Sequence, residues 1–192
     1  MEKKSDIQQI IESAIQRILG SDDTPGNSRS LEFPQVSSKQ KGGSTYFEDL
    51  ETFGTTLSGK YDELTAKGLL IRIGRETFNI VRQSEPDISA LGSIKNRLKP
   101  INKRFNDSLK IAVDWFSVNF GFAVNNKEDA VFTYCLEFER KDNPIFYSPF
   151  FLFGFFEEFC HWLDARKNYR LVYNKPEESK TGEIRIEISH PD

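Results

Sequence analysis

The stretch from 145 to 167, IFYSPFFLFGFFEEFCHWLDARK, constrains the fold more than any other part of the chain. It contains 7 of the 17 phenylalanines and one of the two tryptophans. Ser148 followed by Pro149 is typical of an N-cap and first helical residue, because serine accepts a bond from an orphan N–H and proline has none to lose. The pattern predicts a helix from Ser148 to about Lys167 that is apolar all round up to Glu157 and along one stripe afterwards. Its apolar run is too short to span a bilayer, because Glu157 and Glu158 interrupt it.

The N-terminal segment predicts a second, separate helix over residues 6–19, with Ser5 and Gln8 forming a capping box. A helix of about 14 residues is marginal alone and needs a docking surface. The polar stretch 20–44 reads as a flexible linker, so we expect the helix to dock on a dimer mate or a partner protein rather than on its own domain, 45–192. Its apolar stripe consists of Ile7, Ile10, Ile11, Ala14, Ile15, Ile18 and Leu19.

The hydrophobic period divides the remaining chain into helices and strands. Helical spacing continues over 46–61, 65–82 and 100–121, with a loop or short helix at 84–96. Strands are predicted at 122–125, 130–138, 169–173 and 183–188, the first two joined at 125–129. This order predicts an α+β fold: an antiparallel four-stranded sheet with helices packed on one side, plus an N-terminal amphipathic helix on a linker.

Composition excludes some classes of function. A chain of 192 residues with net charge −3 suits one domain and carries no electrostatic footprint for nucleic acid. The first residues contain no apolar signal region, so we expect a cytoplasmic protein with no transmembrane segment. Cys135 and Cys160 lie in apolar runs and are predicted to be reduced core residues that form no metal site.

The run from Gly68 to Phe78, GLLIRIGRETF, resembles the G-L-x-x-R-I-G-R-x-x-F signature of the 4-vinyl-reductase-like, or hydrocarbon-binding, domain. The helix predicted over 46–61 resembles the one that precedes this signature. Leu98-Lys99-Pro100 stands where a long helix of the family starts, and 153–159 resembles its G-x-x-E-F helix, which is followed by two strands. The resemblance covers about residues 46 to 189.

The resemblance implies a fold shared with small subunits of vesicle-tethering (TRAPP) complexes, a homodimer, and a hydrophobic cavity under the helices. It implies a small hydrophobic or aromatic ligand, with a tetrapyrrole or bacteriochlorophyll precursor among the candidates. The chain would then be a carrier, a sensor, or an accessory factor to chlorophyll 4-vinyl reduction in photosynthetic cells. Many family members carry cysteines in the last hairpin and before the G-x-x-E-F helix, in some of them as metal ligands. The hairpin 174–182 of this chain has none, so no metal is predicted.

Six residues are candidates for ligand binding. Arg72 and Arg75 share a helix face and could bind an anionic group, since guanidinium recognises carboxylates bidentately. The alternative is a structural ion pair, with Glu76 or a carboxylate from the sheet, which is the commoner use of paired arginines. Gly74 between them is interpreted as allowing close helix packing. The aromatic candidates, which line a cavity or else simply fill the core, are Phe150, Phe153, Phe156 and Trp162.

No catalytic residue is predicted. His161 and Asp164 lie three apart on the aromatic helix but lack a nucleophile or third group, and Glu157 and Glu158 point apart as neighbours on a helix. The chain has no G-x-G-x-x-G, flavin or iron–sulfur pattern, which speaks against an independent hydride-transfer enzyme. The favoured function is therefore ligand binding, and the main alternative is a dimeric assembly protein whose core is filled by its own phenylalanines.

Overall fold

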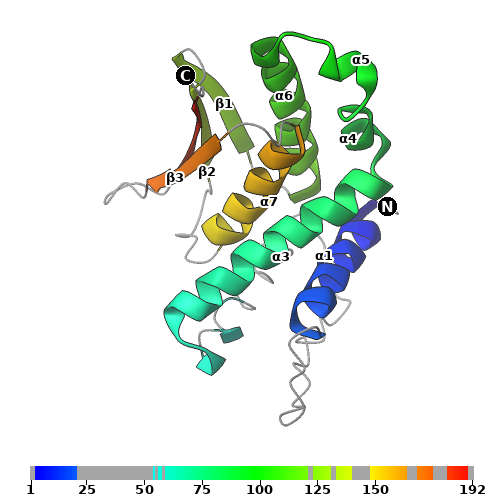
Figure 1. The fold of residues 1–192 in the computed structure, drawn as a ribbon. Coiled ribbons are helices and arrows are strands. Elements are labelled where there is room, and N and C mark those ends of the chain that lie inside the picture. The colour runs from blue at the N-terminus through cyan, green and yellow to red at the C-terminus, as the bar shows by residue number, and fades with distance from the viewer. Residues whose placement is uncertain are drawn as a thin grey trace.

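A computed structural model describes residues 3–20, 54, 56–57, 59–120, 123–130, 133–139, 148–163, 168–174 and 181–189. The helices are α1 (Lys3–Gly20), α3 (Glu63–Ser84), α4 (Pro86–Ala90), α5 (Ile94–Arg97), α6 (Ile101–Phe120) and α7 (Ser148–Leu163). The strands are β1 (Ala123–Ala130), β2 (Thr133–Glu139), β3 (Asn168–Asn174) and β4 (Thr181–Ser189). Figure 1 shows the strands gathered beside α6 and α7, while α1 lies along α3.

The helices α3 and α7 pack so closely that glycine is required on each. A Cβ built on Gly74 would lie 2.9 Å from the backbone nitrogen of Phe155 and closer still to the carbonyl oxygen of Phe151. A Cβ on Gly154 would lie 2.8 Å from the carbonyl carbon of Ile71. Backbone atoms cannot turn away as a side chain can, so any larger residue at either position would force the helices apart. The interpretation of Gly74 as a close-packing residue is confirmed.

Aromatic rings of α7 fill the space between α3 and α6. The ring of Phe155 meets Phe78 of α3 edge-on at 5.3 Å and Phe116 of α6 at 5.2 Å, and it stacks on Trp115 at 5.9 Å. Phe159 meets Phe78 edge-on at 5.8 Å. Edge-to-face pairs of this kind add to the stabilisation that comes from burial alone. The fully buried rings are Phe78, Phe105, Phe116, Phe151, Phe155, Phe156 and Phe159.

The strands form one antiparallel sheet in the order β1-β2-β4-β3. The predicted connection at 125–129 is wrong, because those residues lie within β1, which pairs with β2 from Ala123 to Ala130 with a register shift after Glu128. The polar run NNKED was interpreted as a turn. In the structure it lies on an edge strand, where charged residues discourage pairing with other chains.

The predicted fold class is wrong as an account of this molecule. It placed the helices as a layer on one side of the sheet and the N-terminal helix apart from them. Instead, every described core residue lies in a helix or at the end of one, and α7 contacts α3 and α6 through its rings. The part of the core that the structure describes is therefore built from helices. An aromatic helix that is apolar all round can be buried by other helices as well as by a sheet, and the sequence pattern does not distinguish the two.

The helix α1 belongs to this core. Ile11, Ala14 and Ile15 are buried in the same cluster as the aromatic rings, and Arg17 forms an ion pair with Glu76 of α3 at 2.6 Å. The expectation that the helix prefers a dimer mate or partner protein is not met by this arrangement. The predicted linker and most of the predicted helix at 46–61 lie outside the described residues, so the division into helix, linker and domain remains a prediction.

Candidate functional site

A pair of short helices between α3 and α6 builds a pocket. Pro86 opens α4 at a position where its missing N–H costs nothing. Ser93 caps α5 by accepting a bond from the backbone N–H of Asn96 at 3.4 Å. The residues of α5 end just before Pro100, which cannot continue a helix hydrogen-bond ladder. The segment predicted as a loop or short helix at 84–96 therefore contains both α4 and the start of α5.

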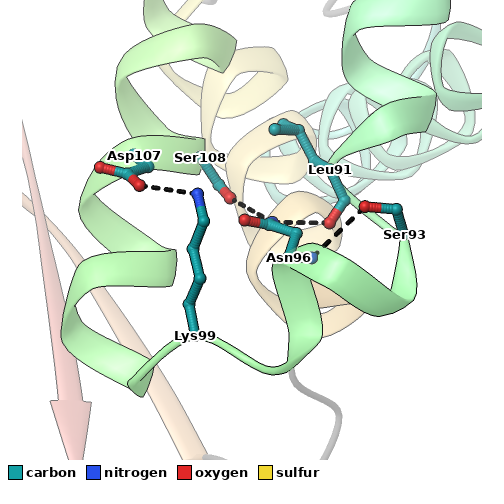
Figure 2. Close-up of polar contacts among 6 residues, drawn as sticks. All are labelled: Leu91, Ser93, Asn96, Lys99, Asp107 and Ser108. Atoms are coloured by element: carbon teal, nitrogen blue, oxygen red, sulfur yellow. Dashed lines mark hydrogen bonds and ion pairs between the residues drawn. The ribbon is translucent and has the colours of Figure 1, made fainter.

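A buried polar pair fixes this segment to α6. Asn96 is 7% exposed and Ser108 is fully buried. The Asn96 side-chain amide donates to the carbonyl of Leu91 at 2.7 Å and to the Ser108 hydroxyl at 3.1 Å, as Figure 2 shows. Buried polar groups are costly unless paired, so these bonds hold the turn in one arrangement.

A second contact joins the same segment to α6 at the pocket's edge. The Lys99 ammonium donates to the Asp107 carboxylate at 2.8 Å (Figure 2). This hydrogen bond, helped by the charges of Lys99 and Lys103, holds the pKa of Asp107 below its ordinary value. Lys99 therefore reaches from the α5 segment back to α6.

The pocket between α4, α5 and α6 has a volume of about 420 Å³ and opens to solvent. More of its lining surface is apolar than polar, and two lysines and one aspartate are among the lining residues, so it offers burial for an apolar body and a cation for an acidic group. The lining residues are Asp87, Ala90, Leu91, Ser93, Lys95, Asn96, Lys99 and Ile111.

The two arginines predicted to bind an anionic group, Arg72 and Arg75, have different surroundings in the structure. Arg75 donates through Nε and a terminal nitrogen to one Glu157 oxygen, at 2.8 and 2.5 Å. This ion pair joins α3 to α7, and its carboxylate comes from the aromatic helix rather than from Glu76 or the sheet. Arg72 lies on an exposed part of α3. Neither arginine lines the α4–α5–α6 pocket.

The aromatic candidates divide into core and half-buried positions. Phe156 is fully buried among the core rings, whereas Phe150 and Phe153 are half-buried, and Lys67 lies 5.1 Å from the Phe150 ring centre. The Trp162 ring packs on Phe78 and against Gly92, whose neighbours in sequence, Leu91 and Ser93, line the pocket. Trp162 thus contacts the backbone that forms the pocket wall but does not line the pocket itself. A ligand-binding role for the predicted residues remains a prediction.

The residues of the observed pocket were missed from sequence. A signal was present in the Ser93 cap and in the Pro100 that ends α5, which together predict a short helix. Nothing in the sequence indicates that Asn96 bonds to Ser108, because the two are twelve residues apart and have no repeating pattern.

Cys160 is a free cysteine buried in the core and does not line the α4–α5–α6 pocket. Burial raises the pKa of its thiol far above the ordinary value, with a smaller contribution from Glu157, so the thiol stays neutral. Among the residues that the structure describes, no cluster of three or more His, Cys, Asp or Glu could hold a metal ion.

Solved structures with the same fold are found at low sequence identity. An oxygen-binding H-NOX domain related to soluble guanylate cyclases has a TM-score of 0.60 at 11% identity, covering 98% of this chain and 96% of its own. An H-NOX domain from Shewanella oneidensis, in its Fe(II)CO ligation state, has a TM-score of 0.58 at 12% identity, covering 95% and 98%. At such identities the similarity establishes the fold alone.

A subunit of a trafficking protein particle complex is also similar. Subunit 3 from Naegleria fowleri, covalently bound to palmitic acid, has a TM-score of 0.52 at 13% identity, covering 77% of this chain and 95% of its own. The predicted link to the fold of vesicle-tethering subunits is supported to this extent.

No protein-family model matches the chain, and no curated protein matches it in sequence. The resemblance to the 4-vinyl-reductase-like family is therefore unsupported, as are its associations with bacteriochlorophyll and photosynthesis. The fold is one shared with H-NOX domains, in place of the fold class predicted from sequence.

Proposed function

We propose that the chain is a small-molecule-binding domain, acting as a carrier or sensor, whose ligand is a hydrophobic or aromatic acid held in the α4–α5–α6 pocket. The pocket carries this proposal. Its volume of about 420 Å³ falls in the range of about 300–1,000 Å³ typical of small-ligand sites. An apolar body would be buried against Leu91 and Ile111, with its acidic group toward Lys95 or Lys99.

The charge of the pocket favours an acid over a neutral or cationic ligand. Its lining contains two lysines and one aspartate, Asp87. Lys99 already pairs with Asp107, so a ligand carboxylate would share that lysine or be bound by Lys95. A charge-assisted bond of this kind is about twice as strong as a neutral one, and it fixes the orientation of a ligand bound mainly by burial.

Similar folds in other proteins support a ligand-binding role. The H-NOX structures were determined with oxygen or with carbon monoxide on Fe(II), and the trafficking-complex subunit with covalently attached palmitic acid. The fold thus holds small ligands in proteins of unlike sequence. For this chain we propose a reversible ligand.

The α4–α5–α6 pocket does not suit an iron tetrapyrrole. Such a group needs a histidine, thiolate, methionine or tyrosine as an axial ligand to its iron. The pocket lining contains none of these residue types, and the buried Cys160 thiol is neutral. Aromatic rings also fill the space between α3, α6 and α7. We therefore propose a ligand without a metal and retain porphyrins only as a comparison in the experiment below.

Tryptophan fluorescence tests the proposal. A Trp115→Phe variant leaves Trp162, behind the pocket wall, as the single reporter. Medium-chain fatty acids and aromatic carboxylic acids should change its emission saturably, while the matched alcohols and amides bind at least about tenfold more weakly, the loss of one charge-assisted bond. Lys95→Met should weaken acid binding by a similar factor. Lys110→Met, an exposed lysine of α6 outside the pocket, should not.

Three results would contradict the proposal. Saturable binding of porphyrins alone would restore the tetrapyrrole hypothesis, and no saturable change with any compound would leave the pocket without a ligand of this class. Acid binding that survives Lys95→Met but fails in Phe150→Ala or Phe153→Ala would instead move the site to the half-buried rings of α7.

The second candidate is a dimeric assembly protein with a self-filled core. The observation that favours it is the set of fully buried phenylalanines, which pack against one another between α3, α6 and α7. The homodimer itself remains a prediction. Light scattering at rising micromolar concentrations should give twice the chain mass, and a constant monomer mass would exclude this candidate.

A further inference from the structure

The segment 93–104, which we call the α5 corner, exposes large apolar side chains to solvent. Ile94 is 79% exposed and Leu98 is 81% exposed. They are four residues apart on one helical turn, so they project from the same face. Figure 1 shows α5 at an outer corner of the molecule, joined to the rest through α4 and α6. Two adjacent exposed aliphatic side chains on one face indicate a contact surface more strongly than one isolated residue does.

The same corner concentrates positive charge. Its twelve residues include five cations and no acidic residue, in a chain whose net charge is −3. Lys99 pairs with Asp107, and Arg104 donates to the Arg97 carbonyl, whereas the side chains of Lys95, Arg97 and Lys103 are exposed. The five are Lys95, Arg97, Lys99, Lys103 and Arg104.

Exposed aliphatic residues among cations suit an anionic lipid surface better than a second copy of this chain or a nucleic acid. A second copy packed symmetrically on this corner would bring the same cations face to face. Nucleic acid would attract the cations but would gain little from Ile94 and Leu98. An anionic lipid surface uses both, since aliphatic side chains enter the headgroup boundary while lysines and arginines contact lipid phosphates and carboxylates.

We propose that the α5 corner docks on a membrane surface rich in anionic lipid, with Ile94 and Leu98 inserted and Arg97 and Lys103 at the headgroups. The contact is peripheral, because no helix among the described residues is long and apolar enough to cross a bilayer. None of these four residues lines the α4–α5–α6 pocket. The docking surface can therefore fail while the ligand site stands, or the reverse.

Vesicle co-sedimentation of the full chain tests this. The protein should pellet with phosphatidylcholine vesicles that contain phosphatidylserine and stay in solution with phosphatidylcholine alone. Ile94→Ser with Leu98→Ser should weaken the partition by on the order of tenfold or more. Arg97→Gln with Lys103→Gln should weaken it by about fivefold per charge at about 0.1 M salt, and by much less at about 1 M.

The chain offers a matched control. Leu64 is 81% exposed near the start of α3, at the end of that helix away from the α5 corner (Figure 1). Leu64→Ser should leave vesicle binding unchanged, and all variants should keep the far-ultraviolet circular dichroism of the parent.

Four outcomes would overturn the proposal. The first is no difference between the two vesicle types, and the second is equal loss in Leu64→Ser and in the Ile94–Leu98 double variant. The third is binding to an oligonucleotide without binding to vesicles. The fourth is a fall in particle mass by light scattering in the double variant while vesicle binding stays absent throughout, which would assign the corner to contact between copies of this chain.

Discussion

At the scale of single residues, Lys99 links the candidate pocket to α6 through an ion pair with Asp107, whose effect on the Asp107 pKa can be measured. Its ammonium donates to Asp107 at 2.8 Å, and this bond is the largest cause of the lowered pKa of that carboxyl. A carboxyl whose pKa is lowered by folding contributes stability above its ordinary value of 3.8, and that contribution is lost as the pH falls through the lowered pKa. The contact between Lys99 and Asp107 therefore weakens when acid protonates the Asp107 carboxylate.

Replacing Lys99 should therefore alter one titration. In Lys99→Met, the Asp107 pKa should rise toward 3.8, with the charge of Lys103 still opposing the rise. The variant should also lose less stability than the parent as the pH falls below about 4. Carboxyl-detected NMR titration measures the first effect, and Lys110→Met is the control. An unchanged Asp107 pKa would mean that the observed bond does not persist in solution.

The sequence predicted the apolar faces of the helices, but it did not predict the partners of the polar residues. Arg75 was a candidate for an ion pair as well as for ligand binding, but its carboxylate, Glu157, lies 82 residues away on the aromatic helix and was not among the predicted partners. Asn96 looked like an ordinary loop residue, and only the fold brings it to Ser108. Pairing of this kind depends on which helices meet, and no local spacing encodes it.

At the scale of elements, the crossing of α3 and α7 gives a sharp test because α3 contains two glycines of opposite character. Gly74 faces the backbone of α7, whereas a Cβ on Gly68 would meet nothing within 4 Å. Gly74→Ala should cost about 2–3 kcal/mol or more, since the clash is with backbone. Gly68→Ala should stabilise by about 0.5–1 kcal/mol through helix propensity. Urea unfolding measures both, and equal effects would refute the close crossing.

Element boundaries were predictable where chemistry marks them. The start of α7 at Ser148 agrees with the predicted serine cap, and the span of α6 from Ile101 to Phe120 agrees with the helical spacing predicted over 100–121. The span of β1 was not predicted, because its run of Asn, Lys, Glu and Asp matches a turn composition equally well. Periodicity shows that a face is apolar. It does not show which element covers that face, and the predicted layer arrangement failed for this reason.

At the scale of the whole molecule, α1 was correctly predicted as a helix, but it was expected to dock away from its own domain and instead packs in the core. Its stripe was recognised, but the length of the following polar stretch was taken to mean that the helix lies apart from the domain. A long linker permits the helix to lie apart from the domain but does not require it, because the entropic cost of closing a loop rises only slowly with its length. In the structure Ile11, Ala14 and Ile15 of this stripe are buried beside α3 within the common core. The helix is thus part of the folding unit.

The last prediction tests this role of α1 with two adjacent residues. Ile15 is 4% exposed, and Gln16 beside it is exposed. Ile15→Ala should cost about 2–5 kcal/mol of unfolding free energy, and Gln16→Ala should change it by less than about 0.5 kcal/mol. Both variants should unfold in one cooperative transition by circular dichroism, with the particle mass of the parent by light scattering. If Ile15→Ala lowers the mass while stability is retained, α1 docks on another chain, as the sequence had suggested.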